Sequence, residues 1–278
     1  MKTFESSWTD ARGLKFYSRG WEPDRAPGAA VAFLHGLGDH IGRYAHIAEA
    51  LSAAGYAMMG MDWRGHGQSG GQRGYAPSLE ALMQDIDLLL DNVRARYSGL
   101  PTFLYGHSLG AIMALNYALR RKPDLAGVIA TDPALHSELE EQQFKVALVR
   151  LLGGVAPTVA LASGLKTSML SHDPQIEQAY INDPLVHDRI SFGLGKVLLA
   201  ANEYALKHAA EFQLPLLLMH GSLDTIAYPS SSREFAAAAG DKATLIVWDG
   251  MYHEIHNELK KDEVIQAVVH WMNDHLPR

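Results

Sequence analysis

The sequence predicts an α/β fold in which a mostly parallel, doubly wound sheet is interrupted by an inserted helical cap. Short apolar runs alternate with amphipathic helical patterns along most of the chain, which is the order expected of a parallel sheet with helices on both faces. The runs are continuously apolar, as in strands that are covered on both sides. This alternation stops between about residues 134 and 212, a stretch too long for an ordinary connection.

The elements follow one another from a hairpin predicted at residues 3–21. The expected strands of the sheet are residues 29–34, 57–62, 102–105, 126–131, 214–219 and 244–248. The expected helices between and after them are residues 43–54, 78–97, 109–121 and about 258–275. We therefore expect a core domain formed by residues 1–133 and 213–278, with residues 134–212 as the inserted cap.

Composition excludes several classes of function. The 278 residues carry a formal net charge of −7, and the 24 lysines and arginines are scattered, so nucleic acid is not an expected partner. There is no cysteine, which excludes disulfides, thiolate catalysis and cysteine-based zinc sites. The amino-terminal residues lack the apolar core of a signal peptide, so a cytoplasmic location is expected.

Two pentapeptides match the pattern G-x-S-x-G, in which glycines allow a serine to lie on a sharp turn between a strand and a helix. The match at residues 106–110 follows the predicted strand 102–105 and opens an apolar helix. The match at residues 67–71 leads into further glycines and opens no helix. Ser108, rather than Ser69, is therefore the candidate nucleophile.

A serine hydroxyl needs a base within hydrogen-bond reach and a third group that orients this base. In enzymes with this turn, the acid and then the histidine follow the serine along the chain. His253, in the loop after the last strand, is the expected base, and His256 is the less favourably placed alternative. Asp224 is the expected acid. Asp132 also follows a strand and stays open as its rival, with a turn cap as its simpler interpretation.

The tetrahedral intermediate of ester hydrolysis needs two backbone N–H donors for its oxyanion. One is the amide that follows the nucleophile, at Leu109, and the other comes from the loop after an early strand. That loop is His35-Gly36-Leu37-Gly38, and Leu37 is the expected donor.

Several segments together resemble the monoacylglycerol lipase and lysophospholipase branch of the α/β hydrolases. They are residues 35–38, 62–69, 106–110, 182–185, 220–224 and 252–259. The resemblance implies the α/β-hydrolase fold and hydrolysis of monoacylglycerols to fatty acid and glycerol, through an acyl-enzyme on Ser108. It assigns the catalytic triad to Ser108, Asp224 and His253, and it implies no metal or organic cofactor.

The cap contains two apolar segments, residues 144–152 and 159–169. We expect them to cover an acyl-chain tunnel and to contact a membrane or lipid aggregate, although packing on the core is the simpler interpretation of any one residue. The candidate substrate-binding residues are Phe144, Leu148, Leu152, Leu185 and Ile226.

The expected ligand is a small-molecule lipid ester, and the sequence indicates no protein partner. Lysophospholipase or broad short-chain carboxylesterase activity is the alternative within the same mechanism. A protein of this fold can also catalyse non-hydrolytic chemistry or bind a ligand without turnover, since fold does not fix function. All three triad positions are filled, which argues against a binding protein.

Overall fold

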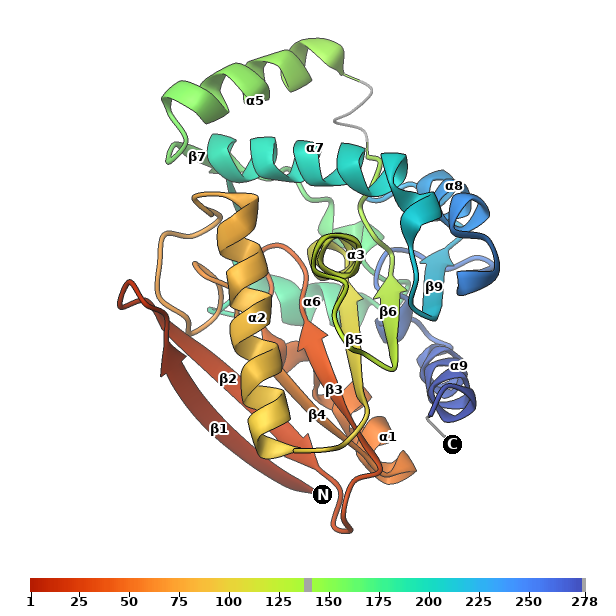
Figure 1. Ribbon diagram of the computed structural model, residues 1–278. Helices are drawn as coiled ribbons and strands as arrows, with labels where there is room; N and C mark the ends of the chain where they lie inside the picture. The colour runs from red at the N-terminus through yellow and green to blue at the C-terminus, as the bar shows by residue number, and fades with distance from the viewer. Residues whose placement is uncertain (138–141, 277–278) are drawn as a thin grey trace.

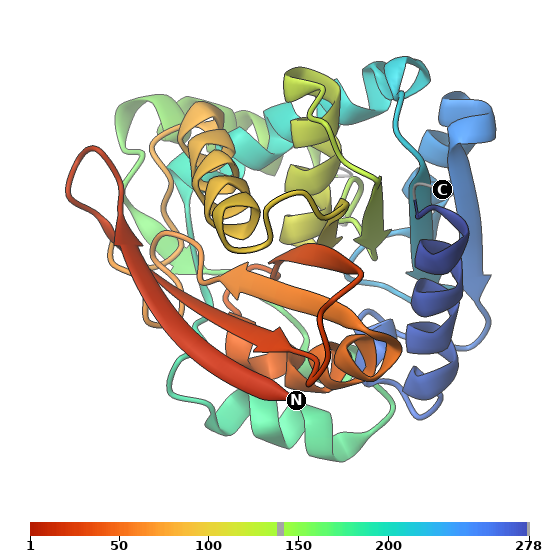
Figure 2. The ribbon, with the colours of Figure 1, turned by 60° about the horizontal axis from the view of Figure 1, so that its bottom comes forward.

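The computed structural model describes residues 1–137 and 142–276 and is centred on an eight-stranded sheet. Its strands are β1 (Lys2–Thr9), β2 (Lys15–Glu22), β3 (Ala29–Leu34), β4 (Tyr56–Met61), β5 (Thr102–His107), β6 (Gly127–Thr131), β9 (Leu216–Gly221) and β10 (Ala243–Trp248). They lie in the order β1-β2-β4-β3-β5-β6-β9-β10. Neighbours from β4 to β10 run parallel, whereas β1 and β2 form an antiparallel hairpin along one edge (Figure 2).

Helices cover both faces of this sheet (Figure 1). The long helices are α1 (Ala45–Ala54), α2 (Leu79–Arg96), α3 (Leu109–Arg121), α5 (Gln143–Val155), α6 (Pro174–Asn182), α7 (Phe192–Lys207), α8 (Pro229–Ala239) and α9 (Lys261–Asp274). Apolar residues of α2, α3, α7 and α8 pack into one core, and those of α1 and α9 into another on the opposite face. Successive residues of β3 alternate between the two cores, as side chains along a strand must.

The α/β fold class predicted from the sequence is confirmed, and the predicted strands and long core helices occur with small shifts at their ends. The helix expected from about residue 258, for example, begins at Lys261 after a short 3-10 turn. Boundaries move in this way because periodicity locates the middle of an element, whereas its ends depend on capping contacts. One such contact is visible at α2, where the Ser78 hydroxyl accepts a hydrogen bond from the Ala81 amide at 3.1 Å.

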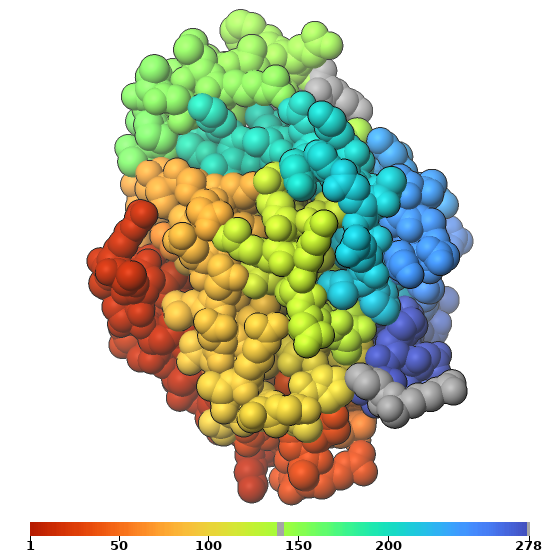
Figure 3. Space-filling model, in the orientation of Figure 1, coloured from red at the N-terminus to blue at the C-terminus, as the bar shows by residue number. Residues whose placement is uncertain are grey.

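The chain between β6 and β9 carries α5, α6 and α7. Helix α7 packs against α3 of the core, and α5 lies on α7 at the surface of the molecule (Figures 1 and 3). This region is not wholly helical: β7 (Ala160–Ala162) and β8 (Arg189–Ser191) pair antiparallel, and the second apolar segment contains β7 rather than a long helix. The cap boundaries at 134 and 212 stay a prediction, and residues 138–141 lie outside the described residues.

None of the helices in the described ranges combines the length and the apolar character that crossing a membrane requires.

Candidate active site

Ser108 lies on a strained turn between β5 and α3, with φ 53° and ψ −114°. A positive φ is rare for a residue other than glycine, so the surrounding backbone must hold it. The two glycines of the pentapeptide permit this close packing: a Cβ on Gly106 would collide with the Gly110 carbonyl oxygen, and one on Gly110 with that of Leu34. The turn projects the serine beyond the carboxyl end of β5, as a nucleophile elbow does.

The second G-x-S-x-G match has a structural role. The Ser69 hydroxyl donates to the carbonyl oxygen of Asp62 at 2.7 Å and accepts from the amide of Tyr17 at 2.9 Å. These contacts tie the loop to β2 and to the end of β4, and the serine is buried. The geometry therefore favours Ser108 over Ser69, as strand and helix placement predicted.

Ser108, His253 and Asp224 form a continuous chain of hydrogen bonds. His253 Nδ1 lies 2.7 Å from Asp224 Oδ2, and His253 Nε2 lies 3.0 Å from Ser108 Oγ. Because a carboxylate only accepts, Nδ1 must carry the hydrogen, which leaves Nε2 free to accept the serine proton. Burial opposes protonation of His253, but the Asp224 carboxylate outweighs it and raises the pKa of the ring above its ordinary value.

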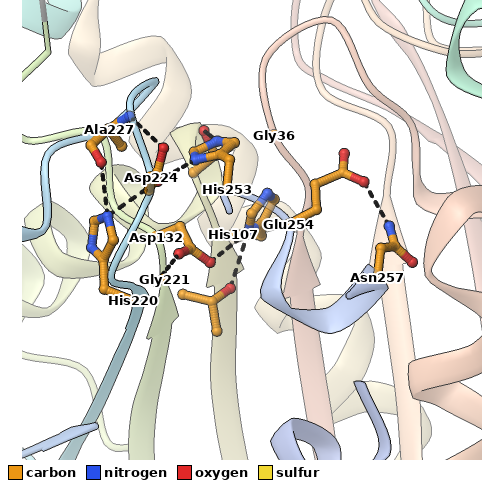
Figure 4. A network of polar contacts seen from close by, with 12 residues as sticks. Gly36, His107, Asp132, His220, Gly221, Asp224, Ala227, His253, Glu254 and Asn257 are labelled. Atoms are coloured by element: carbon orange, nitrogen blue, oxygen red, sulfur yellow. Dashed lines mark hydrogen bonds and ion pairs between the residues drawn. The ribbon is translucent and has the colours of Figure 1, made fainter. Parts of the chain in front are cut away.

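Each oxygen of Asp224 has a distinct set of donors (Figure 4). Oδ1 accepts from the amides of Ile226 and Ala227 at 2.8 and 3.0 Å, whereas Oδ2 accepts from His253 and, at 3.1 Å, from His220 Nε2. Burial alone would raise the pKa of Asp224, but His253 and His220 lower it well below its ordinary range. This carboxylate is therefore fixed in both position and charge.

Asp132 and His256, the two alternatives open from the sequence, make different contacts. Asp132 Oδ1 accepts from the Gly221 amide at 2.9 Å, and Oδ2 lies 3.8 Å from His107 Nδ1. Burial and the nearby Asp224 carboxylate raise the pKa of Asp132 well above its ordinary value. The His256 ring packs edge-on against His107, with centroids 4.5 Å apart. Neither group is hydrogen-bonded to the Ser108 and His253 pair.

Three buried groups near the triad have the residue types of a metal site: the potential ligand atoms of Asp132, His220 and Asp224 lie within 4.8 Å of one another. His220 does not fit that role. Its Nε2 lies 2.9 Å from the Ala227 carbonyl oxygen, which only accepts, so this nitrogen must be a donor. Its Nδ1 is then the acceptor for the Ser232 hydroxyl at 2.7 Å. Both ring nitrogens are used in supporting Asp224.

Ser108 and His253 open into a pocket of about 480 Å³, within the range of small-molecule sites. Leu37 and Leu109, the predicted oxyanion donors, both line it beside the serine. The Leu109 amide begins α3 and so belongs to the N–H groups without an intrahelical acceptor. The further apolar lining includes Ile112, Ala134, Leu165, Leu170, Ile190, Leu198, Leu199 and Ile226.

Of the five candidate substrate-binding residues, Ile226 lines this pocket, and the other four are absent from its lining as far as the described residues go. Phe144 is 81% exposed on the outer side of α5. Helix α5 reaches the described lining through Lys145, whereas Leu198 and Leu199 of α7, the helix on which α5 packs, contribute apolar lining. Substrate contact by the other four residues stays a prediction.

Sequence reasoning also missed a charged cluster beside the triad. Arg43 donates through both terminal nitrogens to the Glu254 carboxylate, at 3.0 and 3.1 Å, and lies 3.2 Å from Asp39 Oδ2. The Tyr180 ring covers the guanidinium, 4.8 Å from its carbon to the ring centroid. Asp39, Tyr180 and Glu254 all line the pocket. The available signal was an acid directly after His253 and an acid and arginine four residues apart after the glycine-rich loop.

This geometry agrees with the comparisons to known proteins. Residues 25–260 match the family model described as serine aminopeptidase, S33. The chain belongs to this family of α/β hydrolases. Membership of the family, together with the hydrogen-bonded serine, histidine and aspartate, makes the protein a serine ester hydrolase.

Some relatives of this hydrolase are named as lipases. It is 30% identical to the monoacylglycerol lipase of Mycolicibacterium smegmatis, over 98% of each chain. It is 36% identical, over 93% of its length, to an uncharacterized abhydrolase domain-containing protein of Dictyostelium discoideum, of which it spans only 28%. The crystal structure of the Paleococcus ferrophilus monoacylglycerol lipase matches with a TM-score of 0.85 and 34% identity, covering 99% of this chain and 100% of that one.

Proposed function

We propose that the protein hydrolyses monoacylglycerols to fatty acid and glycerol, through an acyl-enzyme on Ser108. The observation that carries this proposal is the mixed lining of the pocket at the serine, which combines aliphatic side chains with Asp39, Tyr180 and Glu254. Such a pocket suits an ester with one acyl chain and a small polar alcohol. Similarity to two monoacylglycerol lipases supports the same assignment.

In the proposed reaction, Ser108 Oγ attacks the ester carbonyl while His253 Nε2 accepts its proton. The amides of Leu37 and Leu109 donate to the oxyanion that develops on the carbonyl oxygen. When the tetrahedral intermediate collapses, His253 returns the proton to the glycerol oxygen, the bond from that oxygen to the acyl carbon breaks, and the acyl group stays on Ser108. Water then attacks the acyl-enzyme by the same steps in reverse, and the fatty acid leaves.

Asp224 holds His253 in the tautomer that this reaction needs and stabilises the imidazolium that forms. It has this capacity because its second oxygen is bound to two backbone amides, so the carboxylate cannot rotate away from the ring. His220 contributes to the same end by donating to Asp224 from behind.

We also propose that the outer surface of α5 contacts the lipid aggregate from which substrate is drawn. Phe144, Leu151 and Val155 are 81%, 62% and 72% exposed on this one helix. Large apolar side chains gathered on an exposed surface are typical of membrane or partner contacts, and an amphipathic helix can lie in a lipid interface. Fatty acyl substrates are presented at such an interface.

The central test uses a panel of esters that differ in acyl length and alcohol, assayed with the protein and with Ser108→Ala. Release of fatty acid from monoacylglycerol should be abolished in the variant, and a fluorophosphonate label should attach to Ser108 only in the unchanged protein. Labelling without turnover of any monoacylglycerol would refute the assigned substrate, and a fully active Ser108→Ala would refute the mechanism.

A further inference from the structure

The guanidinium of Arg43 is paired with two carboxylates. Glu254 occupies both terminal nitrogens of the guanidinium in a bidentate pair, and Asp39 lies 3.2 Å from one of them. The side chains of Arg43, Asp39 and Glu254 are only 11%, 3% and 3% exposed. One buried cation thus faces two buried anions, and the cluster has an excess of negative charge.

The charge of Glu254 is secure. Burial opposes its ionisation, but Arg43 outweighs burial and lowers the pKa of Glu254 to about 2. The Asn257 side chain donates a further hydrogen bond to Oε2 at 2.7 Å. Asp39 is held in turn by the Tyr44 hydroxyl, at 2.6 Å, and by the amide of His40. Neither carboxylate is therefore free to turn away from the cluster.

The pocket meets the anions of this cluster rather than its cation. Asp39 and Glu254 belong to the lining together with Ser108, whereas Arg43 is not among the described lining residues, since the two acids and Tyr180 cover it. The same lining includes aliphatic residues of α3 and α7, namely Ile112, Leu198 and Leu199. If the acyl chain packs against these aliphatic residues, the alcohol of the ester faces the part of the pocket that Asp39 and Glu254 line.

We propose that Glu254 makes this end of the pocket selective for uncharged alcohols, so that esters of neutral polyols are hydrolysed and those with a phosphate-bearing alcohol are rejected. The inference rests on the proposed function, because it takes the monoacylglycerol ester as substrate. A phosphate monoester carries close to two negative charges, which like charges in a poorly solvated pocket repel strongly. Arginine is the usual bidentate partner of phosphate, but Glu254 already fills the fork of Arg43.

Hydroxyl groups fit the same surface. A glycerol hydroxyl donates readily to a carboxylate, and hydrogen bonds to charged acceptors are stronger than neutral ones. Two exposed lysines, Lys145 and Lys166, line the pocket on the cap side. These lysines would have the opposite effect, because they would attract a phosphate group that reached the cap side of the pocket.

The test compares two substrates with the same acyl chain, lauroyl glycerol and lauroyl glycerol phosphate, in mixed micelles of one neutral detergent. For the unchanged protein, kcat/KM should favour the neutral ester by about 100-fold or more. This measurement needs no variant. A ratio near one would overturn the inference and would indicate that the lysines dominate.

The decisive variant is Glu254→Gln, which removes one of the two carboxylate charges paired with Arg43 while keeping the size of the side chain. The ratio of the two kcat/KM values should fall by at least about tenfold, because one repulsive charge is removed and a cation is released. The ratio is the readout because any effect of the substitution on the neighbouring His253 acts on both substrates alike. A ratio that stays at its original value would overturn the inference.

Glu258→Gln is the matched control. Glu258 is an equally buried carboxylate four residues on, bound to His172 and to the Tyr252 amide, and it does not belong to the described pocket lining. The substrate ratio should be unchanged in this variant, and a fall equal to that of Glu254→Gln would overturn the inference. If the unchanged protein hydrolyses p-nitrophenyl butyrate but no monoacylglycerol, the proposed function is overturned, and this inference with it.

Discussion

Replacing Asp224 by asparagine should reverse the tautomer of His253 and remove most of the activity. The orientation of the new amide is set by its neighbours, because the amides of Ile226 and Ala227 both donate to the Oδ1 position. The asparagine carbonyl oxygen must therefore take that position, and its NH₂ group must take the Oδ2 position, 2.7 Å from His253 Nδ1. A donor there obliges Nδ1 to accept, so the hydrogen moves to Nε2 and points at Ser108.

The magnitude follows from this change of roles. A ring with hydrogen on Nε2 cannot accept the serine proton, and the imidazolium of the transition state loses its carboxylate partner. The expected loss in kcat is about 10⁴-fold, as for the same change in other serine hydrolases, which corresponds to about 5.5 kcal/mol of transition-state stabilisation. Initial rates with p-nitrophenyl butyrate give kcat, and circular dichroism shows whether the variant is folded.

Asp132→Asn is the matched control for this experiment. Asp132 is another buried aspartate at a neighbouring strand end, but it is bound to the Gly221 amide rather than to His253. Asparagine can keep that bond through its carbonyl oxygen, so kcat should change by less than about tenfold. A folded Asp224→Asn variant with more than a tenth of the activity, or an equal loss in Asp132→Asn, would refute the assignment of the triad acid.

Three further predictions concern pH, stability and the cap. Burial opposes protonation of His253 but Asp224 raises its pKa, so kcat/KM should fall about tenfold per pH unit below a pKa that is higher than usual. Because the charge of Glu254 also raises this pKa, Glu254→Gln should move the acid limb to lower pH, and a shift to higher pH would contradict the assignment. Burial and Asp224 raise the pKa of Asp132 in the folded state, so its stabilising contribution is complete at low pH and is lost as pH rises. In urea titrations, the difference in the free energy of unfolding between Asp132→Asn and the unchanged protein should shift in favour of the variant by at least about 1 kcal/mol between about pH 4 and pH 8. A difference that stays constant with pH would exclude this linkage. Phe144→Ser should change stability by less than about 0.5 kcal/mol, since the side chain is exposed. It should slow hydrolysis of monoacylglycerol in vesicles several-fold while turnover of p-nitrophenyl butyrate stays the same, and equal slowing of both would argue against lipid contact.

The sequence was most informative where function depends on the order of residues along the backbone. The turn at Ser108 needs glycines at fixed positions because a Cβ at either would meet a carbonyl oxygen, so it leaves a readable pattern. The positions of Asp224 and His253 follow from the rule that loops after parallel strands converge at one edge of the sheet. These expectations agree with the hydrogen bonds observed between the three side chains.

The lining of the pocket was harder to predict from the sequence, because it depends on how the helices of the cap pack on one another. Phe144 and Leu198 belong to apolar stripes of similar appearance, and only the packing of α5 on α7 exposes the first and directs the second inward. The pairing of Arg43 with Glu254 spans 211 residues. Charged residues on a loop ordinarily indicate a solvated surface, so their burial against each other has no local signature.

The insertion point of the cap has a consequence for how such enzymes diversify. Strands β6 and β9, which flank the long excursion, pair directly with each other in the sheet, from Val128 against Leu216 to Thr131 against Met219. Because the two strands are parallel, the chain leaves the core at the carboxyl end of β6 and re-enters it at the amino end of β9, so the excursion takes the place of an ordinary crossover connection. A segment of another length or shape can be accommodated there without a change in strand order. Evolution or protein design can therefore replace the segment that faces the substrate while the catalytic residues stay in place.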